Sequence, residues 1–141
     1  MAAVKPIDIA GFEAKFAASE DPWSTWDNPD EVLKRRSILQ ALGPGRLGRV
    51  LELGAGNGSN SHALAARALR LDATEATARG TQLVARAIGH HADRARALQL
   101  AVPAPLPRDR YDAIVIAELL YYLDPCAMRA VSYTHLRAHE T

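Results

Sequence analysis

The fold of this chain is decided by the stretch Leu51-Glu52-Leu53-Gly54-Ala55-Gly56-Asn57-Gly58. It follows Arg49-Val50, so a short apolar run that holds one acid breaks into alternating glycines. The apolar run predicts a short buried strand, and the glycines predict a tight turn whose bare backbone lets a ligand approach closely. Ser59-Asn60-Ser61 then offers oxygen atoms that cap a helix running to Arg67. Strand, glycine turn and helix together are typical of a nucleotide-binding cradle.

The spacing of the glycines and the acid before them indicate which ligand the turn suits. A dinucleotide fingerprint would place its third glycine at position 59, but Ser59 stands there and Gly58 comes one residue early. Glu52 would repel a pyrophosphate and attract an ammonium or sulfonium group. This E-x-G-x-G-x-G pattern resembles the first motif of the class I methyltransferases that use S-adenosylmethionine. The resemblance implies that Glu52, Gly54, Gly56 and Gly58 bind this cofactor.

A second strand is predicted at Leu69–Glu75, with Leu69, Leu71 and Ala73 on one face. An acid at its tip can accept hydrogen bonds from both hydroxyls of a ribose. Glu75 lies close to the separation of about 20 residues expected for such an acid, and Asp72 is the alternative. A simple solvated role for both acids also stays open.

Further elements alternate along the chain as in a parallel α/β sheet. A helix is predicted at residues 77–88, closed by Gly89, and a third strand at 97–101. Residues 101–104 hold no acid that could bind an adenine amino group, so that contact is unassigned, and prolines make the next stretch a stiff loop. The apolar run at 111–117 predicts a central strand, buried on both faces.

Glu118 and Tyr121 follow this last strand, where ligands lie in open α/β sheets. Glu118 is a candidate to orient the acceptor or to act as a general base, or it simply favours a helix start. Tyr121 and Tyr122 are candidates to line the acceptor pocket, or are half-buried packing residues. Residues 118–121 depart from the Asn- or Asp-Pro-Pro-aromatic motif of enzymes that methylate nucleic-acid bases, which argues against a flipped-base substrate.

The residues before the cradle predict a helix from Asn28, a capping residue, to Gly43-Pro44. Trp23 and Trp26 precede it and either cover the cofactor or fasten this helix to the sheet. Together with the glycine turn and Glu118, this segment resembles the nodulation-protein-S type of methyltransferase. That resemblance implies methyl transfer to a small-molecule or sugar amine or hydroxyl.

Composition excludes several other classes of protein. The 141 residues carry 17 basic and 16 acidic side chains, a net charge of +1, so no nucleic-acid-binding stripe is expected. No apolar run is long enough for a membrane span, the histidines do not match a zinc-ligand spacing, and no signal peptide is indicated. The single cysteine, Cys126, fits a reducing cytoplasm. The number of subunits is left open.

The end of the chain suggests a different origin. Residues 131–141 resemble an in-frame translation of a sequencing-library adapter, so we exclude them from fold reasoning as a non-native tail. The expected fold class is α/β, a Rossmann-like three-layer α/β/α methyltransferase fold truncated after the fourth parallel strand. We expect an N-terminal segment at 1–28 and the first part of the methyltransferase domain at 29–130. Such a fragment would be marginally stable, bind the cofactor weakly and turn over little.

Two other functions compete with the methyltransferase interpretation. A dinucleotide-binding oxidoreductase half would share the architecture but needs a phosphate-friendly turn, against which Glu52 and Ser59 argue. An inactive nucleotide-binding fragment is the stronger rival for this chain.

Overall fold

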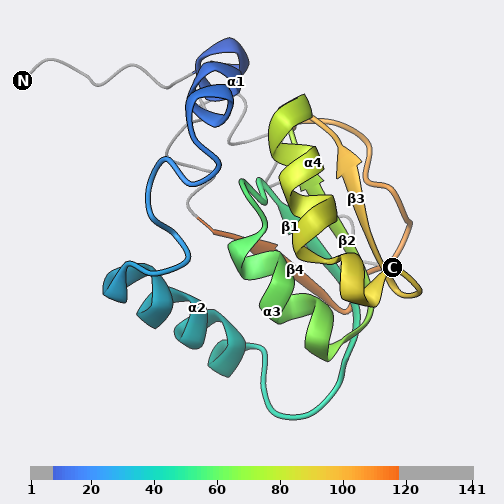
Figure 1. Ribbon diagram of the computed structural model, residues 1–141. Helices are drawn as coiled ribbons and strands as arrows, with labels where there is room; N and C mark the ends of the chain where they lie inside the picture. The colour runs from blue at the N-terminus through green and yellow to red at the C-terminus, as the bar shows by residue number, and fades with distance from the viewer. Residues whose placement is uncertain (1–7, 118–141) are drawn as a thin grey trace, which may run out of the picture.

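A four-stranded parallel sheet forms the centre of the structure, a computed structural model that describes residues 8–117 (Figure 1). The strands are β1 (Leu47–Leu53), β2 (Ala68–Glu75), β3 (Ala95–Gln99) and β4 (Ala113–Ile116). They stand in the order β3-β2-β1-β4, and every neighbouring pair is parallel. The carboxyl ends of the strands therefore meet at one edge, and the predicted Rossmann-like α/β architecture is confirmed.

Helices connect and flank these strands. The described residues form α1 (Ile9–Ala18), α2 (Pro29–Ala41), α3 (Ser59–Arg67) and α4 (Ala78–Ala87), with a short 3-10 helix at Gly89–His91. Figure 1 shows α3 and α4 side by side against one face of the sheet, with α1 beside one end of α4. Within residues 8–117 no helix is both long and apolar enough to cross a membrane.

The predicted boundaries of α2 are confirmed because they depend on local chemistry. The Asn28 side chain accepts a hydrogen bond from the backbone N–H of Asp30, and Pro29 fills the first helical position. The helix ends at Ala41, and Gly43 then turns the chain with a φ of +86°.

The sheet has a different core on each face. One core lies between the sheet and α3 and α4, and α2 adds Ile38, Leu39 and Leu42 to it. Its buried members are Val50, Ala55, Leu64, Ala65, Ala68, Leu71, Ala73, Val84, Ile88, Ala95 and Val115. The second core is smaller and includes three side chains of the loop between β3 and β4. Its members are Leu51, Leu53 and Tyr111, with Val102, Leu106, Ile114 and Ile116 packed against them.

The bounds of the third and fourth predicted strands are wrong, and Leu69 of the second strand is exposed. Leu69 lies in β2, two residues before Leu71, but it is 56% exposed because it lies before the point where β3 begins to pair with β2. The third strand starts at Ala95, two residues before its predicted start. The fourth strand is shorter than predicted, and most of its residues are only partly buried.

The N-terminal residues hold a helix, α1, that the sequence analysis did not predict. Trp23 packs on this helix, with its ring centroid 5.8 Å from that of Phe12 and 5.7 Å from that of Phe16. Trp26 lies edge-on to His62 of α3. These ring contacts join the loop before α2 to α1 and α3, and the two predicted roles of the tryptophans, covering the cofactor or holding α2 on the sheet, stay predictions.

Several predictions concern residues outside the described range. These predictions are the roles of Glu118 and Tyr121, the interpretation of the single Cys126, the non-native tail at 131–141 and the truncation after the fourth strand. The boundaries 1–28, 29–130 and 131–141 stay predictions.

Candidate functional site

The glycine turn follows β1 and consists of residues 54–58. Gly54, Gly56 and Gly58 have φ values of +68°, +63° and +89°. Residues with a Cβ rarely adopt this left-handed region, so the turn needs glycine at each of these positions. A backbone hydrogen bond from Ala55 N to Thr74 O at 2.8 Å joins the turn to β2, and one from Gly58 N to Ala55 O at 3.0 Å closes the turn itself.

The early third glycine has a packing role. A methyl group on Gly58 would lie 2.7 Å from Cβ of Ala87 and 3.0 Å from Cα of Val84. Both distances are too short for carbon atoms, so only glycine lets the start of α3 approach α4 this closely. Direct contact of Gly58 with a cofactor stays a prediction.

The predicted cap of α3 is wrong. Gly58 occupies the N-cap position, and Ser59, Asn60 and Ser61 lie inside the helix. The side chain of Asn57 takes over part of the capping task, because its Oδ1 accepts a hydrogen bond from Ser59 N at 3.2 Å.

Glu52 lies at the end of β1 and is only 2% exposed. One carboxylate oxygen accepts a hydrogen bond from Ser61 Oγ at 2.5 Å, and no Lys, Arg or His of residues 8–117 pairs with it. Burial raises the pKa of Glu52 to about 7; the Ser61 hydrogen bond lowers it and the charge of nearby Glu75 raises it further. A buried carboxylate of this kind is costly to ionise without a positive partner.

Glu75 is the last residue of β2, as predicted, and its carboxylate lies beside the glycine turn. Oε1 accepts a hydrogen bond from Gly56 N at 3.2 Å. Oε2 accepts from Thr77 N at 2.9 Å and from Thr77 Oγ1 at 2.5 Å. Thr77 also caps α4, since its hydroxyl accepts a hydrogen bond from Gly80 N at 3.0 Å. The structure therefore brings Glu52, Glu75 and the predicted glycines together at the carboxyl edge of the sheet.

Asp72, the alternative to Glu75, has a structural role on the other face of the sheet. Its buried carboxylate accepts hydrogen bonds from Arg96 Nε at 2.6 Å, Arg108 Nε at 2.9 Å and Tyr111 Oη at 2.6 Å. Burial raises the pKa of Asp72, but these hydrogen bonds outweigh it and hold the pKa below its usual value. Asp72 lies before the strand end and pairs with two arginines, whereas Glu75 ends β2 beside the glycine turn; the ribose role of Glu75 stays a prediction.

Three polar residues that the sequence analysis gave no such role support this site. Ser61 binds Glu52, Thr77 binds Glu75, and Asn57 links the turn to the residues before α2. Thr77 could have been found as a capping residue three positions before Gly80. The partners of Ser61 and Asn57 depend on tertiary packing, which no local pattern reveals. Among residues 8–117 no group of His, Cys, Asp and Glu side chains could hold a metal ion.

Several solved structures are similar to this chain in fold. The chain is similar to the N-methyltransferase NodS from Bradyrhizobium japonicum WM9 in complex with S-adenosyl-L-homocysteine, with a TM-score of 0.79 and 25% identity over 92% of this chain and 66% of that chain. It is also similar to a proposed methyltransferase from Pseudomonas syringae, with a TM-score of 0.69 and 29% identity over 79% of this chain and 69% of that one. DhpI in a complex with SAM and HEP shares the fold, with a TM-score of 0.71 and 22% identity over 92% of this chain and 57% of that one.

The extent of these similarities limits what they show. This chain spans just under two thirds of the NodS chain, 66% of its length. No protein-family profile matches the sequence, and no curated protein matches it. The order of its parallel strands agrees with the fold that these solved structures share, and the glycine turn after β1 and the acid that ends β2 lie where the sequence motif predicts them. The chain has the Rossmann-like fold of the class I methyltransferases that use S-adenosylmethionine, and it resembles NodS.

Proposed function

We propose that the chain binds S-adenosylmethionine at the glycine turn and serves the transfer of its methyl group to an amine or hydroxyl of a small molecule or sugar. The observation that carries this proposal is Glu52, a buried carboxylate beside the turn without a cationic partner among the described residues. A ligand with an ammonium and a sulfonium group supplies the missing positive charge. A pyrophosphate would add negative charge next to a carboxylate already costly to ionise.

Each site residue has a role that its surroundings support. Gly54 and Gly56 keep the backbone bare for close approach of the cofactor, and a methyl group on Gly56 would meet only the Phe16 ring tip, 4.0 Å away. Glu75 offers its carboxylate to the ribose hydroxyls, while Thr77 holds that carboxylate in place. When bound, the cofactor supplies an activated methyl group on a cationic sulfur, and the protein contributes mainly by holding the reactants in line.

The acceptor side of the site is proposed from the sequence. Glu118 and Tyr121 follow β4 and would orient the acceptor, with Glu118 as a base where the acceptor arrives protonated. The N-methyltransferase activity of NodS supports an amine acceptor. The single cysteine favours a cytoplasmic location.

Isothermal titration calorimetry tests the cofactor proposal directly. The wild-type chain is expected to bind S-adenosylmethionine and S-adenosylhomocysteine and not NAD, whereas a dinucleotide-binding half would show the reverse preference. Absence of binding by all three ligands would favour an inactive fragment and contradict the proposal.

A matched pair of variants shows whether the turn is the binding site. Gly56→Ala and Gly45→Ala both put a side chain on a residue with positive φ, +63° and +80°, and neither new methyl group meets a clash. Both substitutions therefore carry similar backbone strain. Only Gly56→Ala is expected to weaken cofactor binding, by roughly tenfold or more, since each 1.4 kcal/mol of lost contact is a factor of ten. Equal affinities of the two variants would place the ligand elsewhere.

A further inference from the structure

The N-terminal cap, which we define as residues 8–28, lies directly on the glycine turn. Phe16 of α1 is buried, and its ring tip lies 4.0 Å from the position that a Cβ on Gly56 would take. The Glu13 carboxylate accepts hydrogen bonds from Ala78 N and, at 3.4 Å, from Arg79 N at the start of α4. The cap therefore contacts both sides of the proposed cofactor site.

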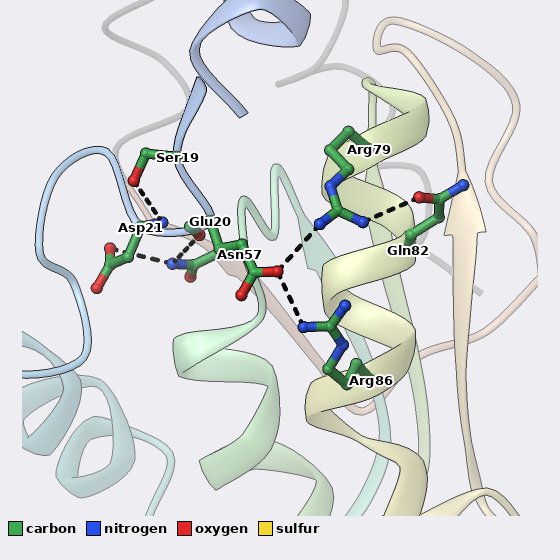
Figure 2. Close-up of polar contacts among 7 residues, drawn as sticks. All are labelled: Ser19, Glu20, Asp21, Asn57, Arg79, Gln82 and Arg86. Atoms are coloured by element: carbon green, nitrogen blue, oxygen red, sulfur yellow. Dashed lines mark hydrogen bonds and ion pairs between the residues drawn. The ribbon is translucent and has the colours of Figure 1, made fainter. Parts of the chain in front are cut away.

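Asn57 joins the cap to the turn through its buried side-chain amide (Figure 2). Its Nδ2 donates to Glu20 O at 3.2 Å and to Asp21 Oδ1 at 3.1 Å. Its Oδ1 accepts from Ser59 N and lies 3.1 Å from Thr25 Oγ1. The backbone N–H of Ser59 fixes which end of the amide is oxygen, so the donor end necessarily faces the cap.

The ion pairs that also join the cap to α4 are weaker links. Glu20 pairs with Arg79 at 3.0 Å and with Arg86 at 3.1 Å, as Figure 2 shows. The Glu20 side chain is 59% exposed, and such pairs contribute little to stability because water screens them. A buried amide that loses its hydrogen-bond partners costs more, because water does not replace them. Asn57 is therefore the stronger of the two connections.

Asn57 also follows Gly56 directly, and Gly56 is the residue whose N–H contacts Glu75, the acid proposed to bind the ribose. The N–H of Gly56 donates to Glu75, and the side chain of the following residue is bound to Glu20 and Asp21. A shift of the cap that pulls on Asn57 would thus change the position of the Gly56 N–H against the Glu75 carboxylate. Docking of the cap and the shape of the cofactor site are linked through one peptide unit.

We propose that Asn57 is a positioning residue that couples docking of the N-terminal cap to the glycine turn and thereby sets how long the cofactor stays bound. This inference rests on the proposed function, because it assumes that the cofactor occupies the turn. The cap must loosen before the cofactor leaves, and Asn57 resists that loosening. Loss of Asn57 therefore acts chiefly on the dissociation rate.

Asn57→Asp tests this coupling with little change in shape. It keeps the oxygen that accepts from Ser59 but replaces the donor that faces Glu20 O and Asp21 with a charged acceptor. Glu20→Gln is the matched control, since it removes the charge that pairs with Arg79 and Arg86 and leaves the Glu20 backbone carbonyl in place. Stopped-flow measurement of S-adenosylhomocysteine binding gives both rate constants. Asn57→Asp is expected to raise the dissociation rate at least tenfold with a much smaller change in the association rate, and Glu20→Gln to change it less than about fivefold.

Hydrogen exchange of the ligand-free chain provides a readout that does not depend on the cofactor. Asn57→Asp is expected to speed exchange of the α1 amides relative to those of β1 and β2. Unchanged α1 exchange, or faster α1 exchange with an unchanged dissociation rate, would overturn the coupling. Failure of the wild-type chain to bind the ligand would instead contradict the proposed function, while the exchange result would still decide whether Asn57 holds the cap. Should Asn57→Asp not fold, Thr25→Val removes the hydroxyl that donates to Asn57 Oδ1 and to Asp21 Oδ1, and it tests the same link between the cap and the turn.

Discussion

Replacing Glu52 with glutamine is expected to stabilise the ligand-free chain in a pH-dependent manner. Burial raises the pKa of this carboxyl from 4.5 to about 7 in the folded protein. Between these values the unfolded chain ionises while the folded chain keeps the proton, so wild-type stability is full below pH 4.5 and falls until about pH 7. Glutamine has nearly the same shape, keeps an oxygen that can accept from Ser61, and does not ionise.

The size of the effect follows from the pKa difference. Each pKa unit corresponds to about 1.4 kcal/mol. A pKa raised from 4.5 to about 7 therefore lowers the free energy of unfolding by roughly 3 kcal/mol at alkaline pH. From pH 5 to pH 8 the advantage of Glu52→Gln in the free energy of unfolding is expected to grow by roughly 2–3 kcal/mol.

Urea-induced unfolding of both proteins at pH 5 and pH 8, followed by tryptophan fluorescence, measures this difference. The comparison between the two pH values removes any constant cost of burying the amide. An advantage that is the same at both pH values, or smaller at pH 8, would refute the assignment of Glu52 as a carboxyl whose ionisation the fold opposes.

Three further substitutions test the packing and hydrogen bonds of the site and the sheet. Gly58→Ala is expected to cost roughly 2–4 kcal/mol in urea unfolding, from backbone strain and the clash with α4. Gly89→Ala, where a methyl group meets open space, is the control and should stay within about 1 kcal/mol. Thr77→Ala should lower the thermal stability by about 1–2 kcal/mol through loss of the α4 cap, and Thr77→Ser should retain most of it; equal losses would contradict a role for the hydroxyl. Tyr111→Phe should cost about 1–2 kcal/mol at pH 7 by removing a donor from Asp72. The stability difference between the two proteins should shrink as the pH falls below 3.8, because the lowered pKa of Asp72 stabilises the fold only while this carboxylate is ionised. A difference that is constant with pH would refute this role of the Tyr111 hydroxyl.

The parts of the fold that could be predicted depend on neighbours in sequence. The start of α2 follows from Asn28 and Pro29, and the turn after β1 follows from its alternating glycines. Glu75 could be placed at the end of β2 because the alternating pattern that begins near Leu69 ends at Glu75. In each case the residues that determine the feature lie within a few positions of it.

The parts that could not be predicted depend on contacts between distant residues. The apolar face of α1 is recognisable only once Phe16 is seen against Trp23 and Gly56. The structural role of Asp72 depends on its hydrogen bonds with Arg108 and Tyr111, which the fold brings to it from the loop before β4. The packing role of Gly58 likewise requires knowledge of where α4 lies.

The central claim is that the buried Glu52 carboxylate receives the positive charge of S-adenosylmethionine, and proton release on binding tests it most directly. At pH 6 a carboxyl with a pKa of about 7 is mostly protonated, and a bound cation would ionise it. Calorimetry at pH 6 in two buffers of different ionisation enthalpy is therefore expected to show release of roughly one proton per cofactor bound by the wild-type chain. Binding by the wild-type chain without proton release would contradict the claim.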